Sequence, residues 1–177
     1  MNKSNNKRYQ LTDIKIENAL LKLLKDKDFN SIYINDICRE ANISRTAFYS
    51  HYDDINDLIL KIQNKYHSHI INILIKDRSS LKNTFTRYFY YLKEHADFYK
   101  AFFNSPENRL ITNQTYDVIF NLYPELVHIP NKTEREIKYH MLFIGAGIKS
   151  IAHKWILDGC IETPEQMSDI LLHEYIS

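Results

Sequence analysis

Turn-forming residues are scarce in this sequence, which has only 3 Gly and 4 Pro among 177 residues. All-β and open α/β folds usually need more of them, so the scarcity favours an all-α fold. The two cysteines, Cys38 and Cys160, are too few for a disulfide framework and lie in apolar helical settings typical of reduced, buried thiols. No apolar run reaches the roughly 18 residues that span a membrane, and the polar first ten residues do not resemble a signal peptide. We therefore expect a cytoplasmic protein with no membrane partner.

The chain also lacks a strong charge of either sign. Its 23 Lys and Arg residues and 22 Asp and Glu residues leave a formal net charge of +1, so the bulk charge indicates no particular partner. Residues 1–52 hold nine basic and six acidic residues. That surplus of three is compatible with phosphate contacts but does not require them.

Signatures of catalysis and of metal binding are missing as well. We find no Gly-rich phosphate loop and no nucleophile elbow, so we do not predict an enzyme. The eight His residues do not form a ligand cluster. His67 and His69 face different sides of a helix, and His140 and His153 are too far apart on one helix to share an ion. We expect neither a metal nor a cofactor.

Hydrophobic periodicity and capping residues predict about nine helices and no strands. Residues 1–10 read as a flexible arm, and Thr12 is the expected N-cap of the first helix, with Leu11 as a staple. Asn42 should end the second helix, Ser44 should cap the third, and Asp53 should cap a long fourth. Apart from this long fourth helix, the expected helices begin and end close to residues 12–25, 34–41, 45–52, 81–94, 97–103, 107–122, 133–158 and 164–177.

The second and third of these helices form a helix-turn-helix pattern, in which the second helix can lie in the major groove of DNA. Phe48 and Tyr52 should then face the core. The expected exposed side chains are Arg45, Thr46, Ser50 and His51. Such helical hairpins also occur in proteins that never bind DNA, so the pattern alone leaves the function open.

The residues within this pattern are more specific than its spacing. The run from Ile32 to Tyr52, followed by Asp57-Leu58, closely resembles the DNA-binding region of the TetR (tetracycline-repressor type) family of transcription regulators. Its most specific part is Phe48-Tyr49-x-His51-Tyr52. The stretch from Gly145-x-Gly147 through Trp155 to Thr163-Pro-Glu resembles one C-terminal subtype of that family. The resemblance implies a helix-turn-helix domain over residues 1–57 and a helical dimerisation and ligand-binding domain over 58–177.

Carried over position by position, the resemblance places base and phosphate contacts at Arg45, Thr46 and Ala47, which open the recognition helix. It implies a phosphate contact for Tyr49 and a backbone contact for His51. The remaining DNA-binding candidates are Ser50, Thr12, Tyr33 and the basic residues of the arm, Lys7 and Arg8, together with Lys3. The arm is equally compatible with a disordered, solubilising tail.

Four positions depart from the family pattern. Asn42 replaces the usual turn Gly, which Asn can tolerate. Ala47 stands where Thr or Ser is common, and Tyr33 stands where Thr is usual. Ile55 occupies a position that usually carries Lys, which removes one phosphate contact. These changes reduce the number of expected phosphate contacts without altering the expected fold.

The long helix 133–158 carries apolar residues at spacings of 4, 3, 4, 3 and 4, which is typical of a helix-packing seam. The seam consists of Ile137, Met141, Ile144, Ile148, Ile151 and Trp155. Because the resemblance places the last two long helices at a dimer interface, we expect the seam to pair two chains. The alternative is that it packs inside its own subunit.

Aromatic residues are abundant in the second half of the chain. The resemblance suggests that some of them line the pocket of an unknown small-molecule effector: Phe85, Tyr88, Phe89, Phe102, Tyr116, Phe120 and Phe143. Aromatic stripes at helical spacing are equally compatible with a solid core.

Together these observations predict a transcription regulator that binds double-stranded DNA as a homodimer on an inverted repeat, with or without an effector. The alternative is a helical adaptor with the same fold that acts through protein contacts. Whether the regulator represses or activates, and which operator and effector it recognises, are left open by the sequence.

Overall fold

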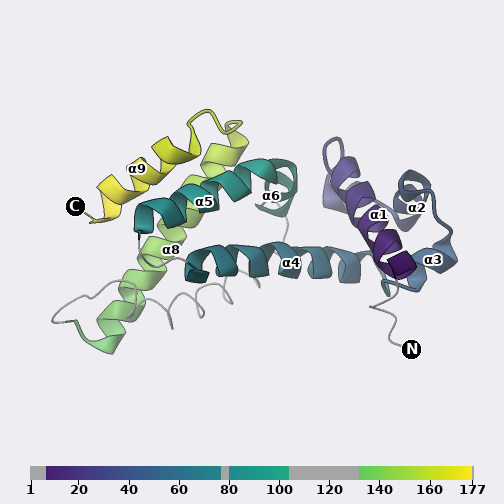
Figure 1. Cartoon of the computed structure of the whole chain (residues 1–177), viewed down its shortest axis with the longest axis horizontal. Helices are drawn as coiled ribbons and strands as arrows, with labels where there is room; N and C mark the ends of the chain where they lie inside the picture. The colour runs from purple at the N-terminus through teal and green to yellow at the C-terminus, as the bar shows by residue number, and fades with distance from the viewer. Residues whose placement is uncertain (1–6, 77–79, 104–131, 177) are drawn as a thin grey trace. The chain divides into compact units, whose positions relative to one another are not determined.

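The computed structural model describes residues 7–76, 80–103 and 132–176 of the chain (Figure 1). Across these ranges the regular structure is helical and includes no strand, as predicted. The chain divides into two compact units, one ending at Lys65 and the other beginning at Tyr66. The change falls within the long helix α4 (Ile55–Lys76). The domain boundary after residue 57 remains a prediction, and the helix expected at 107–122 lies outside the described residues.

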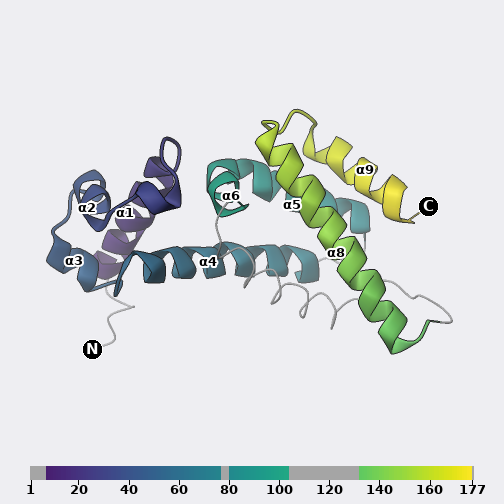
Figure 2. The same ribbon diagram turned by 180° about the vertical axis from the view of Figure 1, so that it is seen from behind.

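In the first unit, α1 (Lys7–Leu23) packs on α2 (Ile34–Ala41), and α2 packs on α3 (Arg45–Tyr49). A short 3-10 turn, η2 (Phe29–Ser31), precedes α2. The helices α2 and α3 lie where the helix-turn-helix was predicted (Figure 2). Each helix carries its apolar side chains on the side that faces the other helices, and these side chains form the core of the unit. The fully buried residues of this core include Ile16, Leu20, Ile37, Phe48 and Leu58.

The start of α1 differs from the prediction, because the helix begins at Lys7 and not at Thr12. Thr12 lies inside the helix, where its hydroxyl donates to the carbonyl of Arg8 at 3.0 Å. A threonine can satisfy its own hydroxyl in this way, so the residue is compatible with a helix interior as well as with a cap. Leu11 is exposed and does not form the expected staple. The last part of the predicted arm is therefore helical.

The cap of α4 is also shifted by one residue. Asp54, not the predicted Asp53, accepts a hydrogen bond from the backbone N–H of Asp57 at 2.8 Å. The Asp57 carboxylate in turn accepts from the backbone N–H of Asp53 at 3.0 Å. Two neighbouring aspartates offer the same capping chemistry, so the sequence alone could not separate them.

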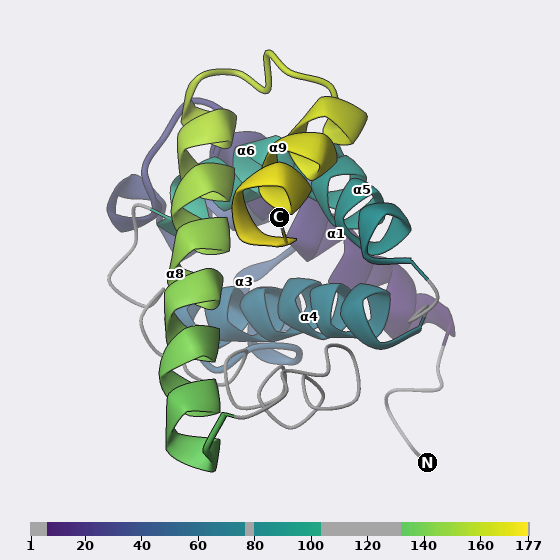
Figure 3. The same ribbon diagram turned by 90° about the vertical axis from the view of Figure 1, so that its left-hand side faces the viewer.

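The second unit contains α5 (Leu81–Glu94), α6 (Ala96–Phe103), α8 (Glu134–Leu157) and α9 (Pro164–Ile176). Helix α9 packs along α5, and α8 packs against α5 and α6 (Figures 2 and 3). The most deeply buried side chains of this unit include Phe89, Leu92, Ala152, Trp155 and Leu171.

The structure contains the capping residues that were predicted for both ends of α8 and for the start of α9. Thr133 and Glu136 form a reciprocal capping box at the start of α8. At the end of α8, Gly159 takes a φ of 86°, which glycine adopts without the strain of a side chain. Thr163 and Gln166 form the second box, at the start of α9. Within the described ranges, no helix is both long and apolar enough to cross a membrane.

Candidate nucleic-acid interface

A tight turn sets the angle between α2 and α3. Asn42 ends α2 in the left-handed region, with φ 52° and ψ 55°, as the sequence predicted. The N–H of the next residue, Ile43, donates to the carbonyl of Cys38 at 3.0 Å, which satisfies one of the last carbonyls of α2. Asparagine fits here because its short polar side chain tolerates this conformation better than most residues do.

Helix α3 is short, and its two sides differ sharply. The Ser44 hydroxyl accepts from the backbone N–H of Ala47 at 3.1 Å and thereby caps the helix. Phe48 is fully buried and packs at 5.7 Å, between ring centroids, from Tyr52, as predicted. The exposed side chains are Arg45, Thr46, Tyr49 and Ser50, while Ala47 is half-buried.

Arg45 and Tyr49 lie one turn apart on the exposed side and contact each other. The guanidinium Nη2 of Arg45 donates to the Tyr49 hydroxyl at 3.3 Å and lies 5.9 Å from the ring centroid. The contact places a guanidinium and a phenol hydroxyl side by side. These groups are suited to base edges and phosphates, respectively.

The start of α2 presents a third exposed aromatic, Tyr33, with 69% of its surface accessible. Beneath it, Asp36 accepts from the Tyr33 backbone N–H at 3.3 Å and from Lys27 and Arg39 at 3.3 and 2.7 Å. The hydrogen bond from Tyr33 and the two cations lower the pKa of the Asp36 carboxyl, which stays ionised. The acid thus anchors the first turn of α2.

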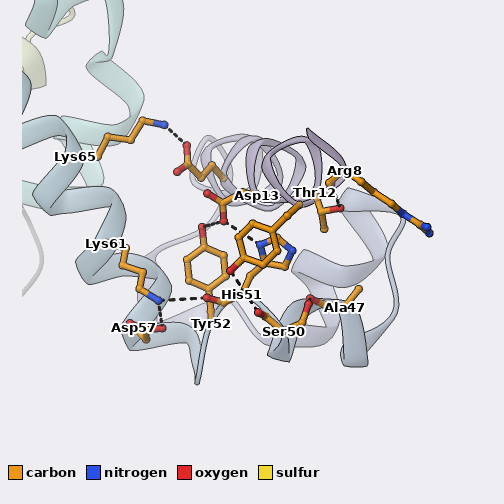
Figure 4. A network of polar contacts seen from close by, with 12 residues as sticks. Arg8, Thr12, Asp13, Ala47, Ser50, His51, Tyr52, Asp57, Lys61 and Lys65 are labelled. Carbon is orange, nitrogen blue, oxygen red and sulfur yellow. Dashed lines mark hydrogen bonds and ion pairs between the residues drawn. The ribbon is translucent and has the colours of Figure 1, made fainter. Parts of the chain in front are cut away.

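His51 does not lie on the exposed side, and the prediction that it does is wrong. Its side chain is only 3% exposed. Its ring stacks on Tyr9 with centroids 3.7 Å apart, and Nδ1 lies 3.2 Å from Oδ1 of Asp13 (Figure 4). The family's backbone-contacting position is therefore turned inward, because α1 supplies both an aromatic face and a carboxylate to cover it.

The first turns of α4 also connect to this region. Lys61 donates to the carbonyl of His51 at 3.2 Å and to the Asp57 carboxylate at 2.8 Å (Figure 4). The ion pair raises the pKa of Lys61 and lowers the pKa of Asp57. Lys65 pairs with Glu17 of α1. Lys61 and Lys65 therefore join the start of α4 to the end of α3 and to α1.

Sequence reasoning missed Tyr9, Asp13 and Lys61 as parts of this region. Tyr9 and Asp13 are four residues apart, so they share one side of a helix that begins at Lys7. Placing the helix start at Thr12 concealed that spacing. Lys7 and Arg8, predicted to lie in a flexible arm, are instead exposed in the first turn of α1, and Lys3 lies outside the described residues.

Some residues of the predicted seam of α8 are buried inside the second unit, and the others are partly exposed at its surface. Met141 and Trp155 are buried, and Trp155 packs at 5.2 Å from Phe89 and donates Nε1–H to the carbonyl of Glu162. These two side chains are packed inside the protomer and are not available to a partner. The other seam residues, Ile137, Ile144, Ile148 and Ile151, are half-buried.

The aromatic residues proposed for an effector pocket are similarly divided. Tyr88, Phe89 and Phe102 are buried, and Phe85 is half-buried. Phe143 is 69% exposed on α8, and its place in a pocket stays a prediction. The other two, Tyr116 and Phe120, lie outside the described residues. In the part of the chain that the structure describes, no group of three or more His, Cys, Asp or Glu side chains is arranged to hold a metal ion.

The C-terminal part of the chain matches a known family. Residues 79–174, more than half of the chain, match the TetR-type family described as a transcriptional regulator C-terminal region. The chain therefore belongs to the TetR family of transcriptional regulators, as the sequence resemblance implied. Its helix-turn-helix, with a capped recognition helix, lies outside that matched region.

One relative matches most of the chain. The protein is 26% identical over 174 residues to YuxN of Bacillus subtilis (strain 168), an uncharacterized HTH-type transcriptional regulator. The match covers 89% of this chain and 59% of YuxN. This chain thus spans less than two thirds of the length of that relative.

Solved structures share the fold at low sequence identity. The dihydroxyacetone kinase operon activator DhaS superimposes with a TM-score of 0.67 at 19% identity, over 93% of this chain and 94% of DhaS. NalD, the secondary repressor of a multidrug efflux pump in Pseudomonas aeruginosa, superimposes with a TM-score of 0.73 at 17% identity, over 97% and 96% of the two chains. An activator and a repressor therefore have the same fold as this chain.

Proposed function

We propose that this protein is a sequence-specific transcription regulator that binds double-stranded DNA through α3. The observation that carries the proposal is the division of α3 into a buried and an exposed side. Phe48 fixes the helix in the core, while Arg45, Thr46 and Tyr49 are presented to solvent. An exposed helix of this kind, following a tight turn, fits the major groove of DNA.

The chemistry of the exposed side suits both kinds of DNA contact. Arg45 can donate two parallel hydrogen bonds to guanine O6 and N7, which discriminate between bases. The Tyr49 hydroxyl can donate to a phosphate oxygen, which positions the helix without reading sequence. Ser50 is a further candidate whose hydroxyl donates here to the carbonyl of Ala47 at 2.7 Å and would have to rotate toward a phosphate. Lys7, Arg8, Thr12 and Tyr33 are further candidates; Thr12 is half-buried and the other three are exposed.

We include a homodimer in the proposal, because one recognition helix reads too few base pairs for useful specificity. Support comes from α8, where Tyr139 and Leu142 are 63% and 42% exposed and Ala146 is exposed next to them. These three positions, spaced by three and four residues, share one side of the helix. In the proposed interface, Tyr139, Leu142 and Ala146 take the place of the buried Met141 and Trp155. The half-buried isoleucines of the seam lie at the edge of this interface.

A two-fold dimer would present two recognition helices to one side of DNA. The half-sites should then form an inverted repeat with centres about 10 bp apart, or a multiple of that distance. The proposal also includes a small-molecule effector in the aromatic interior of the second unit. Its support is that Tyr88, Phe89 and Phe102 are buried there, since ligand pockets are mostly apolar and aromatic.

The experiment is selection of bound duplexes from a random DNA pool by the full chain, followed by footprinting at two salt concentrations. We expect a protected palindrome of roughly 15–25 bp and affinity that falls with salt. A single half-site bound by a monomer would contradict the dimer. A protein that enriches no sequence and shows no salt-dependent DNA binding would act through protein contacts, and the adaptor alternative would replace the proposal.

A further inference from the structure

A partly buried polar cluster joins α1 to the end of the recognition helix: His51 and Tyr52 are buried, whereas Tyr9 and Asp13 are half-buried. It consists of Asp13 from α1 and of His51 and Tyr52, which follow α3 (Figure 4), together with Tyr9 of α1, which stacks on His51. One carboxylate oxygen, Oδ1 of Asp13, lies 2.6 Å from the Tyr52 hydroxyl and 3.2 Å from Nδ1 of His51. The carboxylate of Asp13 therefore holds two consecutive residues, His51 and Tyr52, in the segment that follows α3.

The direction of both hydrogen bonds follows from the chemistry of the groups. A carboxylate only accepts, so Nδ1 of His51 must carry the hydrogen in this contact. Burial and the hydrogen bond to Asp13 raise the pKa of Tyr52, so its hydroxyl keeps its proton and donates. The cluster is thus a set of two donors and one shared acceptor.

Two further contacts hold the same residues from other sides. The Tyr9 ring covers the imidazole of His51, with an interplanar angle of 18°, and its hydroxyl lies 3.4 Å from the carbonyl of Ser50. Lys61 lies 5.0 Å from the centroid of the Tyr52 ring as well as on the carbonyl of His51. The segment 50–52 is therefore tied to both α1 and α4.

This arrangement matters because α3 contains only five residues, Arg45–Tyr49. A helix so short is not stable by itself, so its direction depends on what holds its two ends. Its first turn is held by the Ser44 cap and by Phe48 in the core. Its last turn is held by the cluster, since residues 50–52 follow Tyr49 directly.

We propose that Asp13 and His51 are positioning residues for DNA recognition, which fix the end of α3 on α1 and so aim Arg45 and Tyr49 at the DNA. This inference rests on the proposed function. It differs from a phosphate contact by His51, because the imidazole is occupied by Asp13 and Tyr9 and is almost fully covered. Loss of the cluster should therefore reduce the preference for the correct sequence more than the affinity for DNA in general.

The chain offers a matched control for the test. Asp13→Ala and Glu17→Ala each remove one negative charge from α1, so their general electrostatic effects on DNA binding are the same. Glu17 pairs with Lys65 of α4 and belongs to a separate ion pair, whereas Asp13 holds residues 51 and 52. Asp13→Asn keeps an oxygen acceptor and is the conservative variant.

The measurement is fluorescence anisotropy with two duplexes at one salt concentration: the operator that the wild-type protein selects, and a scrambled duplex of the same composition. Thermal unfolding is followed in parallel. We expect Asp13→Ala to lower the ratio of operator to scrambled affinity by about tenfold or more relative to Glu17→Ala, with equal binding to scrambled DNA. Asp13→Asn should recover part of the loss. The double variant Asp13→Ala/His51→Ala should lose little more than either single variant, because both break the same contact.

Several results would overturn the proposal. Equal ratios for Asp13→Ala and Glu17→Ala would show that the cluster does not aim the helix. If His51→Ala weakened binding to both duplexes equally, His51 would be a phosphate contact. If Asp13→Ala did not fold, Tyr52→Phe, which removes only the donating hydroxyl, would take its place with the same expected direction. If the wild-type protein selected no operator, the proposed function itself would fail, and this inference with it.

Discussion

The most informative single substitution is Ser44→Ala, at the N-cap of the recognition helix. Its hydroxyl accepts from the backbone N–H of Ala47 at 3.1 Å, and the side chain is exposed. Loss of such a cap costs about 0.5–2 kcal/mol, with exposed caps toward the lower end. Because α3 has only one and a half turns, the loss should be concentrated in fraying of Arg45 and its neighbours.

A second serine provides the control. Ser80 caps α5 in the second unit, and its hydroxyl accepts from the backbone N–H of Asn83 at 3.3 Å. Ser80→Ala removes the same kind of hydrogen bond far along the chain from α3. We expect both variants to lower the free energy of unfolding by about 1 kcal/mol. Only Ser44→Ala should also weaken DNA binding, by about fivefold for each kcal/mol spent in reforming α3.

The assays are urea unfolding for stability and gel mobility shift with the selected operator for binding. Ser44→Asn should restore both properties, because asparagine caps about as well as serine. Equal loss of DNA affinity in Ser44→Ala and Ser80→Ala would refute the reasoning, since the effect would then reflect stability alone. Unchanged binding by Ser44→Ala would show that the cap does not support recognition.

Four further outcomes are expected. Arg45→Ala should lower operator affinity by about 1–3 kcal/mol and relax one base position, which binding to a panel of single-base operator variants checks. Tyr49→Phe should weaken all duplexes alike in the same panel; loss at one base only would contradict a phosphate contact. Leu142→Asp should produce folded monomers by light scattering, whereas Trp155→Ala should cost about 3–5 kcal/mol of stability in urea; a dimeric Leu142→Asp would place the interface elsewhere. Burial lowers the pKa of His153 below its usual 6.5, so the unfolded chain binds protons that the folded chain does not. Stability should therefore be complete above pH 6.5 and fall below it, and thermal melts between about pH 7.5 and 5.5 should show a smaller loss for His153→Phe.

The features that the sequence predicted well are those controlled by neighbouring residues. Asn42 ends α2, Ser44 caps α3, and Thr133 and Glu136 form their box because each depends on groups only a few positions away. Hydrophobic periodicity likewise placed Phe48 and Tyr52 in the core.

Apart from the misplaced caps at Thr12 and Asp53, the failures involve partners that are distant in sequence. Asp13 and His51 are 38 positions apart, so no local pattern indicated that the imidazole would be covered. On α8, the prediction was wrong at Met141 and Trp155, which pack inside the protomer, because the helix is apolar on more than one side. Its seam spacing was correctly recognised, yet the exposed Tyr139 and Leu142 lie on a different side from the buried Met141. Periodicity identifies a packing side but not which neighbour covers it.

The start of α4 helps to hold the end of the recognition helix. Helix α4 is continuous from Ile55 to Lys76 and belongs to both units, so it links them covalently. Near its start, Lys61 holds the carbonyl of His51, at the end of the segment that positions α3. Breaking that hydrogen bond would remove one of the contacts that hold residues 50–52, which directly follow α3.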